Sequence, residues 1–286
     1  MITSIRDFGG ELADSPIWIF IPKVWGNFSE EEQGKFVNLK ANIIPYDAEA
    51  DVLKFPFGTK VQAAAIAEEM SLGQTEFLIW LDSDSLVLNA PTEMILPKEK
   101  ILGYRPVHHK LIGSAWGEAL GPFWEMIYQE CQVPRGTGFP MKTHVGEEIW
   151  PYFNAGTFVI RPEIKLLTQW WKTFQKCFRT PAFSSFYEKD TLYAIFMHQA
   201  ILTGVILGTL EPEKVQELSN NINYPLHLHH DIPASLRPNT INELITARHE
   251  NIFDGAEWRQ NLPITEPLIS WIEAQPRVQN STEDSG

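Results

Sequence analysis

Short uninterrupted runs of apolar residues mark the strands that the sequence predicts. The clearest runs are 17–21 and 77–81, and a weaker one is 42–46. Continuous apolar runs of about four to eight residues are typical of strands that are buried on both faces, as in parallel sheets. A fourth strand is expected at 153–160, where the chain enters through a turn of small residues.

Apolar residues at spacings of three and four mark the predicted helices. Ser29 and Glu32 form a capping box ahead of a helix that continues to about Leu39. An Ala-rich helix is expected over 60–70, and Gly73 ends it. Further helices are predicted at 122–131, 162–178, 189–203 and 266–274.

The order of these elements predicts the fold class. Strands alternate with helices over 17–90, which favours an α/β fold with a doubly wound, mostly parallel central sheet flanked by helices. No repeat or linker divides the chain, so 1–276 is expected to form one domain, with an irregular, substrate-specific elaboration at 97–146. The polar residues 277–286 are expected to form a disordered tail.

Composition narrows the classes of partner. The net charge is -13, from 36 acidic and 23 basic residues, and Lys and Arg are not clustered, so a nucleic acid is not expected as a partner. Cys131 and Cys177 have no metal-binding or redox spacing and are expected to be reduced and buried. The start of the chain has no signal-peptide pattern and no stretch approaches ~20 apolar residues, so we expect a cytoplasmic protein without a transmembrane segment.

Two aspartates follow directly after the apolar run 77–81. They are Asp82 and Asp84, with Ser83 between them. Ligands of α/β sheets gather at the carboxyl ends of strands, and paired carboxylates can hold a hard divalent cation. Such a cation can bridge two phosphates of a nucleotide and neutralise the leaving group. The alternative is an ordinary turn, because Asp and Ser are common turn residues.

Three histidines lie close together in the sequence, after the last predicted strand. In an extended segment, His227 and His229 would share one face and His230 would lie opposite. An imidazole beside carboxylates suits Mn²⁺ as well as sites of the Mg²⁺ type, so one of the three is a candidate third ligand. The alternative is a set of surface or core histidines that hold no metal.

Other polar residues are candidates for substrate binding. Asn154 and Gly156 belong to the small-residue turn, where a ligand can approach the backbone closely. Gln199 lies on an apolar helical face and needs a hydrogen-bond partner, which is either backbone or substrate. Lys60 lies at the start of a helix, where a cation is unfavourable for the helix dipole, and this hints at an anionic partner.

In order along the chain, these segments resemble the motifs of GT-A glycosyltransferases, most closely those of the glycogenin and bacterial galactosyltransferase type, family 8. Leu-Ile-Trp-Leu-Asp82-Ser-Asp84 resembles the DxD motif of that family. Phe-Asn154-Ala-Gly156-Thr-Phe-Val-Ile-Arg-Pro resembles its FNSGxxxxxP segment, and Phe-Gly-Thr-Lys60 resembles the nucleotide-binding segment ahead of the acids. His198-Gln199 falls where the family usually has Asp-Gln.

The resemblance implies a metal-dependent hexosyltransferase of the GT-A fold, which moves a sugar from a nucleotide diphosphate sugar to an acceptor. Mn²⁺ or Mg²⁺ would be held by the two aspartates and one late histidine. No residue distinguishes retention from inversion at the anomeric carbon, or identifies the sugar, the acceptor or the oligomeric state. The implied roles are metal binding for Asp82, Asp84 and one of His229 (first choice), His227 and His230; nucleotide binding for Lys60, Asp82, Ser83, Asp84 and Gly156; and contact with the transferred sugar for Asn154 and Gln199.

Two departures from the family pattern leave alternatives open. His198 replaces the usual Asp, and no Gly and Lys-Pro-Trp run follows His230, so a non-catalytic sugar- or nucleotide-binding module on the same fold is a second hypothesis. A nucleotidyltransferase is a third, although 22–26 matches a Gly-rich, basic phosphate loop poorly. A phosphatase of the haloacid dehalogenase type would have Thr or Val two residues after the second Asp, where Leu86 stands.

Overall fold

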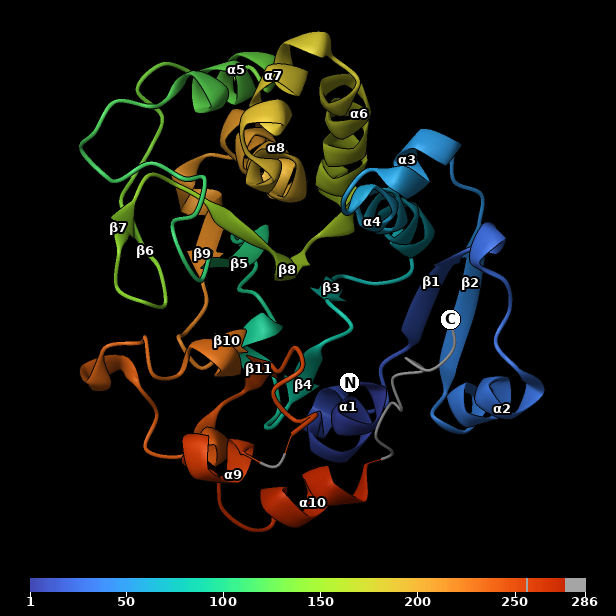
Figure 1. Cartoon of the computed structure of the whole chain (residues 1–286). Helices are drawn as coiled ribbons and strands as arrows, with labels where there is room; N and C mark the ends of the chain where they lie inside the picture. Colours follow the sequence, from blue (N-terminus) through green and yellow to red (C-terminus); the bar gives the residue numbers. More distant parts are fainter. Residues whose placement is uncertain (256, 276–286) are drawn as a thin grey trace, which may run out of the picture.

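The central sheet has four strands in the order β3-β8-β5-β9 (Figure 1). The computed structural model describes residues 1–255 and 257–275, so the predicted tail 277–286 lies outside the described residues. β8 is antiparallel to both of its neighbours, and β5 and β9 are parallel. The strands of this sheet are β3 (Leu78–Leu81), β5 (Leu102–Pro106), β8 (Phe153–Ile160) and β9 (Val215–Glu217).

The predicted α/β class is confirmed, but the prediction of a mostly parallel central sheet is wrong for these four strands. All eight residues of β8 are buried. An apolar run reports burial on both faces of a sheet and carries no information about strand direction. β8 is therefore as apolar as a parallel strand while it runs antiparallel.

Two smaller sheets flank the central one. β1 (Ile17–Pro22) and β2 (Ala41–Tyr46) are parallel, and α2 (Glu30–Asn38) connects them. The predicted capping box of α2 is confirmed, because the Ser29 amide donates to Glu32 Oε2 at 2.8 Å and the Glu32 amide donates to Ser29 Oγ at 3.3 Å. The other sheet has the order β10-β11-β4, and its strands are β10 (Tyr224–Pro225), β11 (Thr246–Arg248) and β4 (Ser85–Val87).

Helices α4 to α8 form a layer over one side of the central sheet, whereas α1, α9 and α10 lie beside the β10-β11-β4 sheet (Figure 1). The prediction of one helix over 162–178 is corrected, because a 3-10 turn (Pro162–Ile164) is separated from α6 by Lys165, whose φ is 56°. α1, α3, α7 and α9 were not predicted. The helices besides α2 are α1 (Ile2–Phe8), α3 (Ala50–Lys54), α4 (Gly58–Ser71), α5 (Pro122–Glu130), α6 (Leu166–Phe178), α7 (Pro181–Lys189), α8 (Thr191–Thr209), α9 (Trp258–Asn261) and α10 (Leu268–Ala274).

α8 is the most apolar helix of this layer. By length and composition it is long and apolar enough to cross a membrane, with a mean hydropathy of 1.5, a feature that the sequence analysis did not single out. In the fold, 61% of an 18-residue stretch of α8 is buried, and α5, α6, α7 and β8 pack around this helix. A helix that is buried on several sides is apolar around most of its circumference, which explains why α8 is as long and apolar as a membrane-spanning helix.

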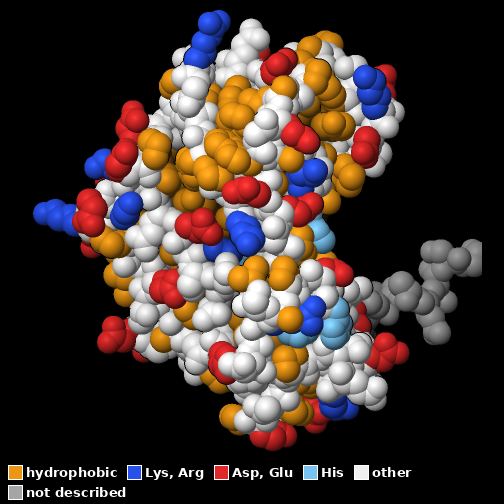
Figure 2. Space-filling model, turned by 90° about the vertical axis from the view of Figure 1, so that its left-hand side faces the viewer, with side chains coloured by type: hydrophobic (Ala, Val, Ile, Leu, Met, Phe, Trp, Pro, Cys, Tyr) orange, Lys and Arg blue, Asp and Glu red, His pale blue; other side chains and the backbone are white. Residues whose placement is uncertain are grey.

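The outer surface over these helices differs from the rest of the face that Figure 2 shows. Hydrophobic side chains gather on the upper part of this face, at the level of α5 and α7, whereas basic and acidic side chains are interspersed below them. No extended basic patch covers this face. The remaining small sheet is the hairpin of β6 (Met141–Lys142) and β7 (Glu148–Ile149), which begins inside the segment 97–146 and ends just beyond it.

The hydrophobic core has separate parts on the two sides of the acidic motif. The largest cluster joins the central sheet to α4, α5, α6, α7 and α8, and a second cluster joins β4, β10 and β11 to α9 and α10. The chain passes from β3 to β4 through 82–84. The two aspartates therefore lie where the central sheet meets the β10-β11-β4 sheet.

Glu68 on α4 is a fully buried carboxylate that caps a different helix. It accepts hydrogen bonds from the amides of Leu167 at 2.9 Å and Thr168 at 2.7 Å, and from the Thr168 hydroxyl at 2.7 Å. These amides belong to the first turn of α6, whose N-cap Lys165 supplies no side-chain hydrogen bond. The carboxylate thus satisfies donors that the helix itself leaves free.

We expect Glu68→Ala to lower the free energy of unfolding by about 3 kcal/mol, because it leaves buried amides at a helix N-terminus without an acceptor. Glu69→Ala is the matched control, since Glu69 is the exposed neighbour on the same helix, and its effect should stay within about 0.5 kcal/mol. Urea denaturation of the three proteins measures the difference. Equal midpoints for the two variants would show that Glu68 does not cap α6.

Candidate functional site

Asp82 and Asp84 are held by strand pairing on both sides. The Asp82 amide donates to the Gly156 carbonyl at 2.8 Å, which extends the antiparallel pairing of β3 and β8 by one residue. The Asp84 carbonyl accepts a hydrogen bond from the His249 amide at 3.0 Å, just beyond the pairing of β4 with β11. The backbone at both acids is therefore fixed before any ligand binds.

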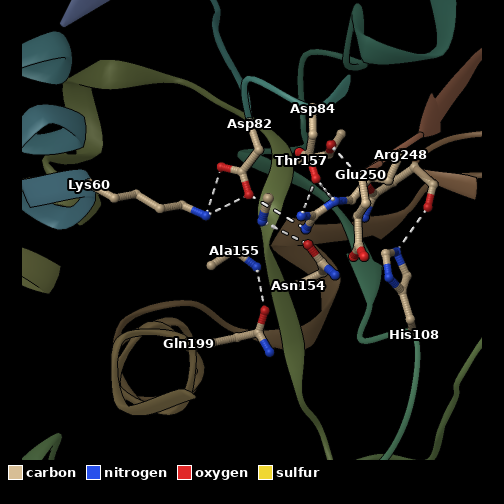
Figure 3. A network of polar contacts seen from close by, with 12 residues as sticks. Lys60, Asp82, Asp84, His108, Asn154, Ala155, Thr157, Gln199, Arg248 and Glu250 are labelled. Carbon is tan, nitrogen blue, oxygen red and sulfur yellow. Dashed lines mark hydrogen bonds and ion pairs between the residues drawn. The ribbon is translucent and has the colours of Figure 1, made fainter. Parts of the chain in front are cut away.

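Lys60 is the third residue of α4, and its side chain ends between the two oxygens of Asp82 (Figure 3). Its Nζ is 2.7 Å from Asp82 Oδ1 and 2.8 Å from Asp82 Oδ2. Burial lowers the pKa of Lys60, and the charge of Asp82 opposes this effect. Burial raises the pKa of Asp82, but Lys60 and Arg248 outweigh it, so the pKa stays below its usual value. Asp82 is therefore ionised at neutral pH.

Arg248, at the end of β11, pairs with both acids (Figure 3). Its Nη2 and Nε are 2.6 and 3.2 Å from Asp84 Oδ2, and its Nη1 is 3.5 Å from Asp82 Oδ2. The sequence analysis did not select this residue, because nothing near it in the sequence marks it and only the pairing of β11 with β4 brings it to the acids. We call Lys60, Asp82, Asp84 and Arg248 the acid–base cluster.

Gly156 on β8 lies directly against the acid–base cluster. A Cβ at this position would be 2.8 Å from Asp82 Oδ2, 2.9 Å from Arg248 Nη1 and 3.0 Å from Asn154 Oδ1. Distances below about 3.0 Å are closer than carbon and oxygen atoms pack without strain. The structure thus explains the glycine by a close approach, as the sequence suggested, although the approaching atoms belong to the protein.

Asn154 and Gln199 both use their side-chain oxygens on the backbone of β8 (Figure 3). Asn154 Oδ1 accepts from the Gly156 amide at 2.7 Å, and Gln199 Oε1 accepts from the Ala155 amide at 2.9 Å. The two side chains are buried. Of the alternatives for Gln199, the backbone is the partner of its oxygen, and the amide nitrogen remains for another acceptor.

A family model described as a Rhodobacterales glycosyltransferase domain matches residues 1–194. The chain belongs to this family. The predictions of a glycosyltransferase and of an enzyme are thereby confirmed, and the matched range contains Asp82, Asp84, β8 and most of the helical layer. Arg248 lies beyond the matched residues.

Several solved glycosyltransferase structures are similar to this glycosyltransferase. The galactosyltransferase LgtC, in complex with donor and acceptor sugar analogues, is 16% identical with a TM-score of 0.47, and the match covers 94% of this chain and 93% of that one. Mouse xyloside xylosyltransferase 1 is 12% identical with a TM-score of 0.42, covering 82% and 84%. GlyE of Streptococcus pneumoniae TIGR4 is 12% identical with a TM-score of 0.39, covering 86% and 52%. Among curated proteins, none matches the sequence.

In this glycosyltransferase, the histidine segment is not extended, so the predicted alternation is wrong. Residues Leu226–Leu228 form a 3-10 turn, and the amides of His229 and Asp231 donate to carbonyls three residues earlier in the chain. Alternating His and Leu residues fit such a turn as well as they fit a strand. His229 is buried, and its Nδ1 is 2.8 Å from the Tyr224 hydroxyl.

The other two histidines of the segment have different surroundings. His227 Nε2 is 3.5 Å from Glu250 Oε1, and His230 is exposed. None of the contacts described for 1–255 and 257–275 joins His227, His229 or His230 to the two aspartates by a hydrogen bond or ion pair. The histidine that does contact the motif is His249, through its backbone amide. The third metal ligand stays a prediction.

The acid–base cluster, as arranged, does not fit Mn²⁺ or Mg²⁺. One atom favours a cation, because Asp84 Oδ1 is buried without a hydrogen-bond partner in the described part of the chain. However, Lys60 covers both oxygens of Asp82 and Arg248 covers the other oxygen of Asp84. Within the described residues, no three His, Cys, Asp or Glu side chains converge as ligands. The remaining predicted residue, Ser83, is exposed in the turn between the acids.

His198, which replaces the usual Asp, is buried between aromatic rings. Its ring stacks on Phe57 at a centroid distance of 4.4 Å, and its Nδ1 is 2.9 Å from the Ile195 carbonyl. Burial, with a contribution from Lys60, lowers the pKa of His198 to about 3. The imidazole is therefore neutral in the folded protein, and a neutral ring beside Lys60 avoids repulsion between two cations.

We expect part of the acid sensitivity of this protein to come from His198. A histidine whose folded pKa is about 3 and whose usual value is 6.5 supplies stability that is present above pH 6.5 and lost as the pH falls toward 3. His198→Asn should reduce the slope of stability against pH in this window by up to about 1.4 kcal/mol per pH unit. Urea denaturation at pH 7, 6 and 5 measures the slope, with His230→Asn as an exposed control. An unchanged slope in His198→Asn would refute the assignment.

Proposed function

We propose that this glycosyltransferase moves a sugar from a nucleotide diphosphate sugar to an acceptor hydroxyl, with the diphosphate bound at the acid–base cluster. The observation that supports this most directly is the pair of cations, Lys60 and Arg248, held against two acids at the carboxyl end of β3. Sheet ends of this kind are where α/β proteins bind ligands. Cationic side chains there can stabilise the negative charge of a departing diphosphate.

In the proposed reaction, the bond between the anomeric carbon and the diphosphate oxygen breaks, and its electron pair leaves with the nucleotide diphosphate. A new bond forms between the anomeric carbon and the acceptor oxygen, whose proton passes to a base. Lys60 and Arg248 offset the charge that develops on the leaving group. Positioning of the sugar against the acceptor supplies the rest of the rate enhancement.

Asn154 and Gln199 are the residues that we place beside the transferred sugar. Their oxygens accept from the β8 backbone, which fixes the orientation of both amides. Their NH₂ groups are then the atoms available to donate to sugar hydroxyls. Gly156 keeps β8 close enough to the acid–base cluster for one ligand to contact both.

The metal-dependent form of the proposal needs one change in the site. Asp82 and Asp84 could hold Mn²⁺ or Mg²⁺ only if Lys60 and Arg248 turned away from their oxygens, since Lys60 now contacts both oxygens of Asp82 and Arg248 contacts Oδ2 of Asp84. A bound cation would supply positive charge to the diphosphate. The backbone amide of His249 donates to the Asp84 carbonyl. His249 is then our first candidate for the third metal ligand, ahead of His229, His227 and His230.

A cytoplasmic location is also proposed. Cys131 and Cys177 are both free, Cys177 is buried and Cys131 is half-buried. Burial raises the pKa of both thiols, to about 12 for Cys177, so neither is a reactive thiolate. Unpaired cysteines fit a reducing compartment, and this supports the proposal.

A non-catalytic nucleotide-sugar-binding module is the second candidate function. It is favoured by His198, which is neutral and buried where the family 8 motif that the sequence resembles has an acid. A module of this kind would bind the donor and release it unchanged. Binding and turnover therefore have to be measured separately.

A panel of nucleotide diphosphate sugars tests the proposal, first by thermal shift and then by release of nucleotide diphosphate. A donor at 100 times its Kd should stabilise the folded protein by about 2.7 kcal/mol. We expect at least one donor to bind and to be slowly hydrolysed without an acceptor. Binding without any hydrolysis would favour the module, and the absence of both would refute the proposed function.

A further inference from the structure

The acid–base cluster is electrically complete. Two carboxylates, Asp82 and Asp84, face two cations, Lys60 and Arg248, at distances of 2.6 to 2.8 Å for the close pairs. All four side chains are largely buried, with exposures of 12% for Lys60, 16% for Asp82, 21% for Arg248 and 22% for Asp84. A divalent cation between two carboxylates would bring the same two positive charges.

Adding a divalent cation would leave these four side chains with an excess of two positive charges in a largely buried site, which Glu250, the next acid near Arg248, would offset in part. Interactions between charges are stronger there than at the surface, because the effective dielectric constant is lower. The cation would have to compete with an ammonium for Asp82 and with a guanidinium for Asp84. The existing side-chain cations therefore oppose metal binding at the position where it was predicted.

Arg248 keeps donors for a ligand while it binds the acids. A guanidinium has five N–H groups in a planar fork, which suits phosphate as well as carboxylate. Its Nε and Nη2 lie close to Asp84 Oδ2, and Nη1, at 3.5 Å from Asp82 Oδ2, is only loosely engaged. The acids hold the guanidinium in one orientation, and N–H groups on Nη1 and Nη2 remain for phosphate oxygens.

From this balance we infer that Arg248 takes the place of the divalent cation in this chain and binds the diphosphate of the donor directly, so that donor binding needs no metal. The inference rests on the proposed function, because it concerns the same site and the same ligand. Asp82 and Asp84 then orient two cationic side chains. Gly156 leaves the space in which Arg248 Nη1 lies, since a Cβ there would be 2.9 Å from it.

Binding of UDP, GDP, ADP and dTDP tests the inference by calorimetry, in EDTA and in Mn²⁺, on the full chain. We expect at least one of them to bind the unaltered protein with a Kd in EDTA within about threefold of that in Mn²⁺. Arg248→Met should weaken binding in EDTA by about tenfold or more, because charge-assisted contacts to phosphate are lost. Arg248→Lys keeps the charge and should lose less than Arg248→Met.

A second readout measures metal binding without nucleotide. Titration of Mn²⁺ followed by electron paramagnetic resonance should show about tenfold tighter binding to Arg248→Met than to the unaltered protein, because the two acids lose one counter-charge. Arg179→Met is the matched control. Arg179 also pairs with two acids, Glu49 and Asp51, but lies on α6's exposed end away from the cluster, and its variant should behave like the unaltered protein in both assays.

The outcomes separate the inference from the proposed function. Nucleotide binding that occurs only with Mn²⁺ would overturn the inference and leave the proposed function standing. The absence of nucleotide binding under both conditions would remove the proposed function, and the inference with it. If Arg248→Met binds nucleotide in EDTA as well as the unaltered protein does, the inference is also wrong. If Arg248→Met fails to fold, Arg248→Lys and the unaltered protein in EDTA still decide between these outcomes.

Discussion

Asp82→Asn is expected to lower donor hydrolysis and glycosyl transfer by about 10²- to 10³-fold, the range found when one electrostatic contact to a developing charge is removed. The carboxylate orients Lys60 through both of its oxygens and contacts Arg248 as well. An amide of the same shape keeps the volume but loses the charge. Lys60 would then lie buried without the counter-ion that positions its amine. Its pKa would also fall, because the charge of Asp82 no longer opposes the effect of burial.

The same substitution should destabilise the protein by about 3 kcal/mol, because removing one partner of a buried pair leaves the other charge uncompensated. Asp14→Asn is the control, since Asp14 pairs with Lys40 at the surface, where the two side chains are 83% and 71% exposed. Turnover of the donor found in the panel is compared at a temperature where melting curves show all proteins folded. An Asp82→Asn enzyme with more than half of the original activity would rule out the proposed site.

Gly156→Ala is expected to weaken donor binding and to destabilise the protein with no change in charge. The new methyl group would meet Asp82 Oδ2, Arg248 Nη1 and Asn154 Oδ1 at 2.8 to 3.0 Å. None of these atoms is free to move, because the first two belong to the acid–base cluster and Asn154 Oδ1 accepts from the Gly156 amide at 2.7 Å. Overpacking of this kind costs about 1–3 kcal/mol, and here the displacement falls on the groups that bind the diphosphate.

Donor binding in Gly156→Ala should weaken by about tenfold or more, as expected for a loss of roughly 1.4 kcal/mol in binding. Gly34→Ala is the matched control. Gly34 lies inside α2, no atom is within 4 Å of its added Cβ, and helix propensity should make that variant slightly more stable. Calorimetry with the nucleotide and urea denaturation measure the two effects. Unaltered nucleotide binding in Gly156→Ala would show that the close approach has no role in the site.

Elements that depend on local chemistry could be predicted well. The capping box of Ser29 and Glu32, the strand ahead of Asp82 and the helix that carries Lys60 are all present within one or two residues of their predicted limits. Burial selects apolar residues for strands, and hydrogen bonds select particular polar residues for helix caps. Both therefore leave a pattern in neighbouring residues of the sequence. Two predictions failed where one local pattern fits two conformations: the direction of β8 and the shape of the histidine segment.

The sequence by itself predicted an α/β fold with two aspartates directly after an apolar strand, since an apolar run followed by acids is a local feature, and the resemblance of its motifs to those of glycosyltransferases supplied the enzyme class. Only the tertiary structure decided what faces those acids. Arg248 lies 164 positions from Asp84 and reaches it because β11 pairs with β4, and His229 is turned to Tyr224 by its own local fold. Which charges meet in a site depends on strand pairing between distant segments, and one-dimensional patterns do not contain that pairing.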